Sequence, residues 1–296
     1  MALTPQAFQF VSDFVRREAA IVLEPGKEYL VESRLAPVAR KAGFPTLDAF
    51  LDHIRTAPRS SPLMYQIVDA LTTNETLFFR DHHPFEALKK EILPRLIEAR
   101  KSVRKLSIWS AAASTGQEAY SLAMLLRENF PMLASWDVRI LGTDLSTTVL
   151  EQAKSGSYSQ LEVNRGLPAP LLVKYFEKAD GRWIIKEDLR RMCEFRAMNL
   201  TTPWPMMSPF DLIFIRNVLI YFDQATKQGI LKRMRGVLLP HGSLFLGTAE
   251  TTINLDPEWV PTKVGNTTVF RVLGKGGAPA TTAAPASAPP VAPRAA

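Results

Sequence analysis

The chain has 296 residues, of which 46% are apolar, and this suits one large globular domain or two smaller ones. Its one cysteine, Cys193, excludes an internal disulfide and fits a reducing compartment. The net charge of +7 raises the question of nucleic-acid binding, but Lys and Arg are interspersed with Asp and Glu and form no long basic run. A mildly basic surface suits an acidic protein partner equally well, so we expect no nucleic-acid partner.

No apolar stretch reaches the roughly 18 residues that a membrane-spanning helix requires. The first five residues lack the basic region and the apolar core of a signal peptide. We therefore expect a cytoplasmic protein that does not insert into a membrane, and we expect it to be a monomer.

Residues 1–72 are predicted to be helical, because apolar residues recur at helical spacing and no strand-like alternation is present. The residues expected to keep this spacing are Phe8, Val11, Phe14, Val15, Tyr29, Leu30, Leu35, Val38, Phe50, Leu51, Ile54, Leu63, Ile67 and Leu71. Thr46 is expected to cap the third helix. This pattern predicts a small all-α domain at the start of the chain.

From Leu106 onward, apolar strands alternate with helices, which predicts a doubly wound, mostly parallel sheet in an α/β domain over 73–273. Strands are expected at 106–111, 138–143, 193–198, 210–215 and 242–247, and helices at 117–129, 146–155 and 224–238. Pro240 and Gly242 are expected to end the last of these helices. A hairpin joining 259–264 to 267–272 through Gly265-Asn266 should follow.

Two segments depart from this alternation. Residues 156–192 are less regular, with a turn at Asp180-Gly181, and we expect a small excursion on the carboxyl edge of the sheet. Residues 274–296 are mostly Ala, Pro, Gly, Thr and Ser, a composition that cannot bury a core, so this tail is predicted to be disordered.

The carboxyl ends of the predicted strands should form the ligand site, as they do in other parallel sheets. Asp144 ends the second strand and can hold a ribose diol. It could instead cap the following helix, but Ser146 can serve as that cap and leave Asp144 free. Glu118 lies in the first turn of the helix after the first strand, where it could also simply complement the helix dipole.

The loop between the first strand and its helix favours one cofactor class. Residues 111–116 are small but lack the G-x-G-x-x-G pattern of dinucleotide-binding loops, and Glu118 beside a pyrophosphate would repel it. S-adenosyl-L-methionine carries an ammonium and a sulfonium and no phosphate. The acidic residue therefore favours a methyltransferase over a nucleotide-dependent oxidoreductase.

Four motifs resemble those of the chemotaxis receptor glutamate O-methyltransferases (the CheR-type family). They are TTNETLFFR at 72–80, IWSAAASTGQEAYS at 108–121, GTD at 142–144 and FDLIFIRNVLIYFD at 210–223. The resemblance covers residues 1 to about 273 and leaves out the tail. Two positions depart from the family pattern: Gln117 stands where an acid is common, and Ala119 where a proline is common, which puts the stiffness of the loop in question.

The resemblance implies roles for residues at matching positions. The cofactor-binding set would be Asn74, Thr76, Arg80, Glu118, Asp144, Asn199, Leu200, Arg216 and Asn217. The first three would face the methionyl part of the cofactor, and Arg80 would fork its carboxylate. Glu118 would take the ammonium and Asp144 the ribose hydroxyls. Asn199 and the backbone of Leu200 would contact the adenine edge.

The candidate catalytic residues are Arg80 and Tyr221. Tyr221 would reach toward the reacting groups from beside the site floor, which Arg216 and Asn217 would line, although it could also pack with its hydroxyl at the surface. The implied reaction is methyl transfer to glutamate carboxylates of a chemoreceptor, giving methyl esters and S-adenosyl-L-homocysteine. A free glutamate titrates near pH ~4.3, so it is already ionised at neutral pH and needs no general base.

Other residues in these motifs are expected to be structural. Phe78 and Phe79 should pack in the core. His82-His83 should begin a helix, because no third ligand lies at metal-binding spacing, and we expect no metal.

The helical domain is expected to dock the substrate through Arg34, Arg40 and Lys41, since the methylation helices of chemoreceptors are acidic. A solvated helix face is the alternative, because Glu28 and Glu32 precede this basic stretch. The segment 176–191 is short and has no Gly-rich insertion, so it resembles the family members that do not dock on a receptor tail.

Three other functions remain open at this stage. A nucleic-acid methyltransferase often has an Asn/Asp-Pro-Pro-aromatic turn after the fourth strand, where this chain has Arg216-Asn217-Val218-Leu219. A non-catalytic cofactor-sensing module should have lost some cofactor-facing residues, yet those named above are present. The third is the same chemistry on a receptor-like protein of a pathway other than motility.

Overall fold

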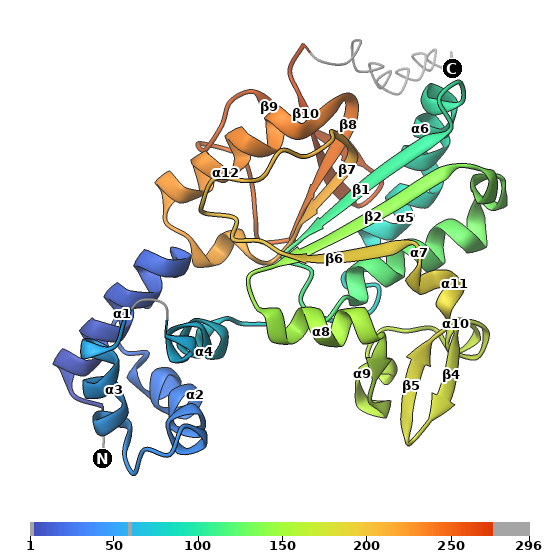
Figure 1. The fold of residues 1–296 in the computed structure, drawn as a ribbon. Helices are drawn as coiled ribbons and strands as arrows, with labels where there is room; N and C mark the ends of the chain where they lie inside the picture. Colours follow the sequence, from blue (N-terminus) through green and yellow to red (C-terminus); the bar gives the residue numbers. More distant parts are fainter. Residues whose placement is uncertain (1–2, 59–60, 275–296) are drawn as a thin grey trace, which may run out of the picture.

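The computed structural model describes residues 3–58 and 61–274, which form a helical domain followed by an α/β domain (Figure 1). The tail predicted to be disordered lies outside the described residues, except for Gly274. No helix in the described ranges combines the length and apolar character that crossing a membrane requires.

The helical domain contains the four predicted helices, α1 (Pro5–Ala19), α2 (Glu28–Lys41), α3 (Leu47–Thr56) and α4 (Pro62–Leu71). Thr46 caps α3 as predicted, because its side chain accepts a hydrogen bond from the Ala49 N–H. The predicted inward face of α2 is wrong in part: Tyr29 is 64% exposed. Residues four apart share one face of a helix, and Val31, Leu35 and Ala39 form the buried stripe, which Tyr29 does not join.

The α/β domain is built on a seven-stranded sheet in the order β6-β2-β1-β7-β8-β10-β9. The bounds are β1 Lys105–Ala111, β2 Asp137–Asp144, β6 Cys193–Ala197, β7 Phe210–Ile215, β8 Leu238–Leu246, β9 Trp259–Val264 and β10 Thr267–Val272. The first five strands in that order are parallel, and β10 runs antiparallel to β8 and β9. The predicted doubly wound sheet with a C-terminal hairpin is therefore confirmed.

Helices cover both faces of this sheet (Figure 1). α7 (Gln117–Asn129) and α8 (Thr147–Ser155) pack on the face opposite α12 (Gln224–Val237). A further stretch, α5 (His83–Ala87), a π-helical turn (Leu88–Ile92) and α6 (Leu93–Arg100), packs with α7 in one apolar core. Phe78 and Phe79 are buried in that core, as predicted.

The expected end of the last helix is wrong. α12 stops at Val237 and β8 begins at once, so Pro240 and Gly242 lie inside a strand. Gly242 serves a close approach: a Cβ there would lie 2.8 Å from the Asp211 carbonyl oxygen on the neighbouring strand. Gly242, which was predicted to end a helix, therefore allows two neighbouring strands to approach closely.

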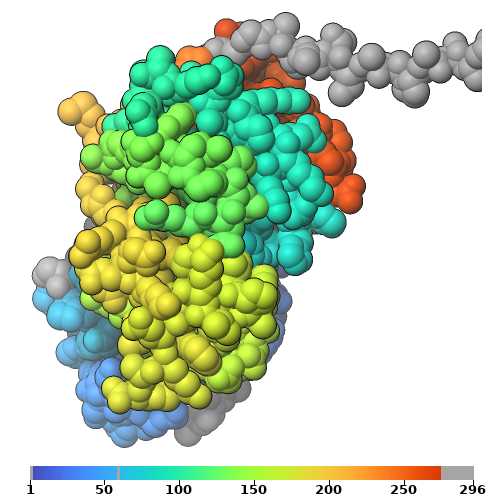
Figure 2. All heavy atoms as spheres, turned by 90° about the vertical axis from the view of Figure 1, so that its right-hand side faces the viewer, coloured from blue at the N-terminus to red at the C-terminus, as the bar shows by residue number. Residues whose placement is uncertain are grey.

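The excursion between α8 and β6 is more regular than expected. Its elements are β3 Ser157–Tyr158, α9 Gln160–Asn164, α10 Ala169–Tyr175, β4 Phe176–Ala179, β5 Arg182–Ile185 and α11 Glu187–Arg190, and its strands form a sheet in the order β3-β5-β4. The predicted turn at Asp180-Gly181 has two left-handed residues. The excursion forms much of the surface in Figure 2 and contacts the loop after β1, where the Tyr158 hydroxyl donates to the Thr115 carbonyl at 2.7 Å.

Candidate active site

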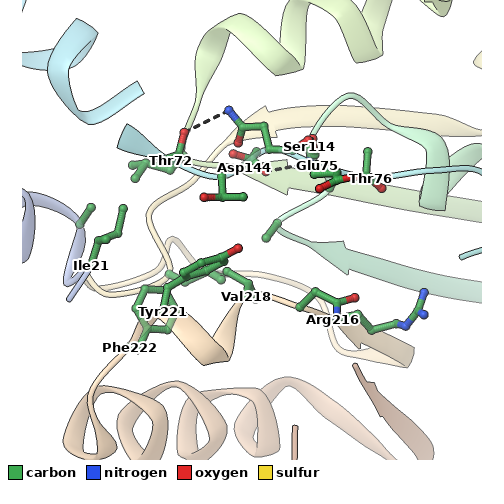
Figure 3. A pocket seen from close by; sticks show the side chains of 18 of the residues that line it. Ile21, Thr72, Glu75, Thr76, Ser114, Asp144, Arg216, Val218, Tyr221 and Phe222 are labelled. Atoms are coloured by element: carbon green, nitrogen blue, oxygen red, sulfur yellow. Dashed lines mark hydrogen bonds between the residues drawn. The ribbon is translucent and has the colours of Figure 1, made fainter. Parts of the chain in front are cut away.

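A pocket lies at the carboxyl ends of β1, β2 and β7, between the sheet and the helical domain (Figure 3). The sheet supplies one wall, and the linker that follows α4 supplies the other, together with Ala19 and Ile21. Every residue predicted to bind the cofactor lines this pocket: Asn74, Thr76, Arg80, Glu118, Asp144, Asn199, Leu200, Arg216 and Asn217. Tyr221 lines it as well.

The loop after β1 is shaped by left-handed backbone. Ala112 and Ser114 have φ values of 60° and 50°, and Gly116 has φ 92°. A Cβ on Gly116 would lie 3.0 Å from the Ala153 Cβ, so both conformation and space require glycine. The unusual Gln117 is buried and accepts a hydrogen bond from the Thr115 hydroxyl at 2.7 Å, which braces the loop.

Asp144 faces this loop from the end of β2. Its carboxylate accepts hydrogen bonds from the Ser114 N–H at 2.8 Å and the Ser146 N–H at 3.0 Å. Ser146 caps α8 with its own hydroxyl, as predicted. Burial raises the pKa of the Asp144 carboxyl above its ordinary value, although these backbone bonds oppose the rise. A ligand that donates hydrogen bonds to the carboxylate would favour its ionised form.

Glu118 and Arg216 form an ion pair in the wall of the pocket. The Glu118 carboxylate accepts from the Ser110 hydroxyl at 2.7 Å and from Arg216 Nη1 at 2.9 Å. Arg216, whose side chain is 2% exposed, also pairs with Asp81 at 2.7 Å and donates to the Arg80 carbonyl at 2.9 Å. Arg216 was predicted to line the floor of the pocket. Its guanidinium also links Glu118 to the segment that carries Arg80.

Sequence reasoning missed Asp81, and backbone geometry explains its importance. Phe79, Asp81 and His82 have φ values of 49°, 68° and 49°, a conformation that residues other than glycine rarely adopt. The Phe79 N–H donates to the Ser121 hydroxyl at 2.9 Å, and Arg216 holds Asp81. These contacts offset the strain and fix the point from which Arg80 enters the pocket.

Arg80 itself keeps most of its donors available. Its hydrogen bond within the described ranges runs from Nη1 to the Glu75 carbonyl at 3.1 Å. Asn74 completes this wall, since its carbonyl accepts from the Ser114 hydroxyl at 2.7 Å. The linker and the loop after β1 are thereby joined across the pocket.

Asn199 connects the two domains beside the pocket. Its amide donates to the Glu18 carbonyl at 2.8 Å, and its Oδ1 accepts from the Thr201 N–H at 2.9 Å. One amide hydrogen is left for a ligand. The neighbouring Leu200 carbonyl accepts from Arg233 at 2.6 Å. Asn199 and Leu200 were predicted to contact the adenine edge. Most of the polar groups of these two residues already make hydrogen bonds within the protein.

Asn217 and Tyr221 follow β7. Asn217 is left-handed, with φ 59°, and its buried Oδ1 has no hydrogen-bond partner within the described part of the chain. Tyr221 ends the 3-10 helix Leu219–Tyr221, and its ring reaches into the pocket in Figure 3. Its carbonyl accepts from the Val22 N–H at 3.0 Å, which ties it to the helical domain.

The charged side chains that line the pocket match the charged and polar groups of S-adenosyl-L-methionine. Glu118 offers a carboxylate to an ammonium, Asp144 offers one to a diol, and Arg80 offers a guanidinium to a carboxylate. The two acidic side chains suit a ligand without phosphate. Among residues 3–58 and 61–274, no cluster of three His, Cys, Asp or Glu side chains could hold a metal ion.

The three residues predicted to dock the substrate do not act alike. Arg34 donates to the Leu71 carbonyl at 3.0 Å, the Thr72 carbonyl at 2.8 Å and the Thr73 hydroxyl at 3.1 Å. Its guanidinium therefore holds the linker wall. Arg40 and Lys41 are exposed in the last turn of α2.

Comparison with known proteins gives a consistent result. The model for the all-alpha domain of CheR methyltransferases matches residues 6–72, and the model for their SAM-binding domain matches residues 74–268. A relative in Pseudomonas aeruginosa, chemotaxis protein methyltransferase 1, is 44% identical over 253 residues, covering 84% of this chain and 91% of its own. The chemotaxis protein methyltransferase of Vibrio parahaemolyticus is 40% identical over 260 residues, covering 86% and 92% respectively.

Proposed function

The chain belongs to the CheR methyltransferase family and transfers methyl groups from S-adenosyl-L-methionine to glutamates of chemoreceptors; we propose that the pocket described above is the site of this transfer. The observation that carries the proposal is the gathering of Glu118, Asp144, Arg80 and Tyr221 around one pocket. These residues come from four separate segments of the chain, so their convergence is a property of the fold.

The proposed binding mode follows from charge. S-adenosyl-L-methionine, when bound, supplies a methyl group on a positively charged sulfur. Glu118 accepts the ammonium, Arg80 forks the carboxylate, and Asp144 accepts from the ribose hydroxyls. Asn74 and Thr76 flank the methionyl part, while Asn199 and Leu200 contact the adenine edge. Arg216 supports Glu118 and Arg80 from behind.

For the transfer itself, the chain orients groups and excludes water. The receptor carboxylate is ionised at neutral pH and is the nucleophile, so no residue need remove a proton. Its oxygen gains the methyl carbon as the bond to sulfur is lost, and both the negative and the positive charge disappear. Arg80, Asn217 and Tyr221 hold the acceptor in line with the methyl group, and proximity of this kind accounts for much of the rate.

The receptor is proposed to dock on the helical domain. Arg40 and Lys41 present two exposed cations near the end of α2, which suit an acidic receptor helix. Arg34 contributes by holding the linker. We also propose that the protein works as a monomer in the cytoplasm, where the methylation helices lie, and that it needs no docking on a receptor tail.

The test is to mix the protein with methyl-labelled S-adenosyl-L-methionine and the cytoplasmic part of a chemoreceptor, and then to treat the product with alkali. Label released as volatile methanol is expected, because carboxyl methyl esters are labile to alkali. Label that enters the receptor but resists alkali would indicate N- or S-methylation and contradict the chemistry. Cofactor binding without incorporation would favour a sensing module or another acceptor.

A further inference from the structure

Glu250 makes four hydrogen bonds to the backbone at the carboxyl edge of the sheet. Its Oε2 accepts from the Gly247 N–H at 2.7 Å and the Asn217 N–H at 2.8 Å. Its Oε1 accepts from the Val218 N–H at 2.9 Å and the Leu219 N–H at 2.7 Å. One carboxylate thus joins the turn after β8 to the turn after β7, more than 30 residues away in sequence.

These bonds shape the segment that carries Asn217 and Tyr221. Three successive N–H groups, from Asn217 to Leu219, converge on one point because Asn217 is left-handed. Successive backbone N–H groups arranged in this way form a concave site for an anion, and Glu250 fills it. The 3-10 helix that ends at Tyr221 starts at Leu219, whose N–H is the last of these three groups. The carboxylate therefore sets where that helix begins.

Glu250 and Asn217 lie close to Gly247. A Cβ on Gly247 would lie 2.7 Å from Glu250 Oε2, 2.8 Å from the Asn217 backbone nitrogen and 2.9 Å from Asn217 Nδ2. The glycine is therefore required by close approach, and the Asn217 amide is held against it. Glu250 itself does not belong to the lining of the cofactor pocket.

We propose that Glu250 is a positioning residue for methyl transfer, acting through Asn217 and Tyr221. This inference rests on the function proposed above. Glu118, Asp144 and Arg80 lie on other segments, so the loss of Glu250 should disturb the placement of the acceptor more than the binding of the cofactor. An error of about 1 Å in such placement can cost on the order of a hundredfold in rate.

The test compares Glu250→Gln with wild type, using the full chain and the cytoplasmic part of a chemoreceptor. The variant keeps the side chain's size, but its neutral amide places an NH₂ group against backbone N–H donors. We expect kcat to fall about 30-fold, with the Kd for S-adenosyl-L-homocysteine changed less than about 3-fold. Calorimetric titration gives that Kd and also the fraction of protein competent to bind. Glu177→Gln, which removes the same charge from an exposed position on β4, is the matched control and should behave as wild type.

Gly247→Ala perturbs the same turn without changing charge and guards against misfolding of the first variant. In Gly247→Ala, kcat should also fall while the Kd for S-adenosyl-L-homocysteine changes little. An unchanged kcat in Glu250→Gln would overturn the inference, as would a fall in kcat that merely follows the loss of binding-competent protein or of cofactor affinity. A wild-type protein that binds S-adenosyl-L-homocysteine but forms no alkali-labile ester would instead contradict the proposed function itself.

Discussion

The two walls of the pocket are held by different forces. Asp144 ends a strand paired along its length to β1 and β6, so the sheet fixes its backbone. Arg80 lies on a linker without sheet pairing, held by side chains from elsewhere, namely Arg34, Ser121 and Arg216. One binding site therefore depends both on strand pairing and on side chains that brace a linker, and the two kinds of support can be disturbed separately.

The largest effect is expected from a change at Glu118, which contacts both walls through Ser110 and Arg216. Glu118→Gln removes the proposed ammonium acceptor and leaves the buried Arg216 with one carboxylate partner, the partly exposed Asp81. We expect the affinity for S-adenosyl-L-methionine to fall at least about 100-fold by calorimetry, and the free energy of unfolding to fall by about 3 kcal/mol in urea denaturation. Glu187→Gln removes a partner from an exposed pair with Arg191 and serves as the control. Unchanged affinity would mean that Glu118 is not the ammonium site.

A second change loosens the linker wall alone. Asp81→Asn removes the charge that pairs with Arg216 outside the pocket, so Arg80 should lose its fixed placement while the sheet wall stays intact. We expect kcat for receptor methylation to fall about 10- to 30-fold and the cofactor Kd to rise, because Arg80 is proposed both to orient the acceptor and to fork the cofactor carboxylate. If neither the cofactor Kd nor kcat changes, the pairing of Asp81 with Arg216 does not fix the placement of Arg80.

A third change touches neither wall. Replacing Arg40 and Lys41 by Glu should reduce kcat/KM for the receptor about 10-fold at low salt, because acidic receptor helices would be repelled, and the difference should shrink as salt is added. The Kd for the cofactor should not change. Methylation at the wild-type rate would place receptor docking elsewhere.

The smallest expected effect concerns pH and the sheet wall. The raised pKa of Asp144 means that its ionised form is disfavoured in the free protein, so folding loses stability as the pH rises from the ordinary aspartate range through the raised pKa. Ribose hydroxyls donate to the ionised form, so cofactor affinity should weaken a few-fold as the pH falls through that raised value. Calorimetry across acidic pH checks this, with Asp144→Asn as the comparison. An equal pH dependence in that variant would assign the effect to another group.

Local features of the chain were enough to predict most of the scaffold and two acidic residues of the site, Glu118 and Asp144, while the resemblance to the CheR-type family implied the others. Thr46 and Ser146 were identifiable as caps because capping depends on neighbours a few residues away. Asp144 was identifiable as a site residue because parallel strands bring their carboxyl ends to one edge. The same local reasoning misplaced Tyr29 and misread Gly242, since burial depends on which face meets the rest of the protein.

The sequence by itself determined the order of elements, through hydrophobic periodicity, and the cofactor class, through the charge at strand ends. Most of the residues that line the pocket were implied by the resemblance of the motifs to the CheR-type family. Only the tertiary structure decided how those residues are held. Arg216 meets Asp81 across 135 residues, Asn199 meets the Glu18 carbonyl across 181, and Glu250 meets the turn at Asn217 across 33. No periodicity marks such pairs, because each partner satisfies a buried group that exists only after the chain has folded.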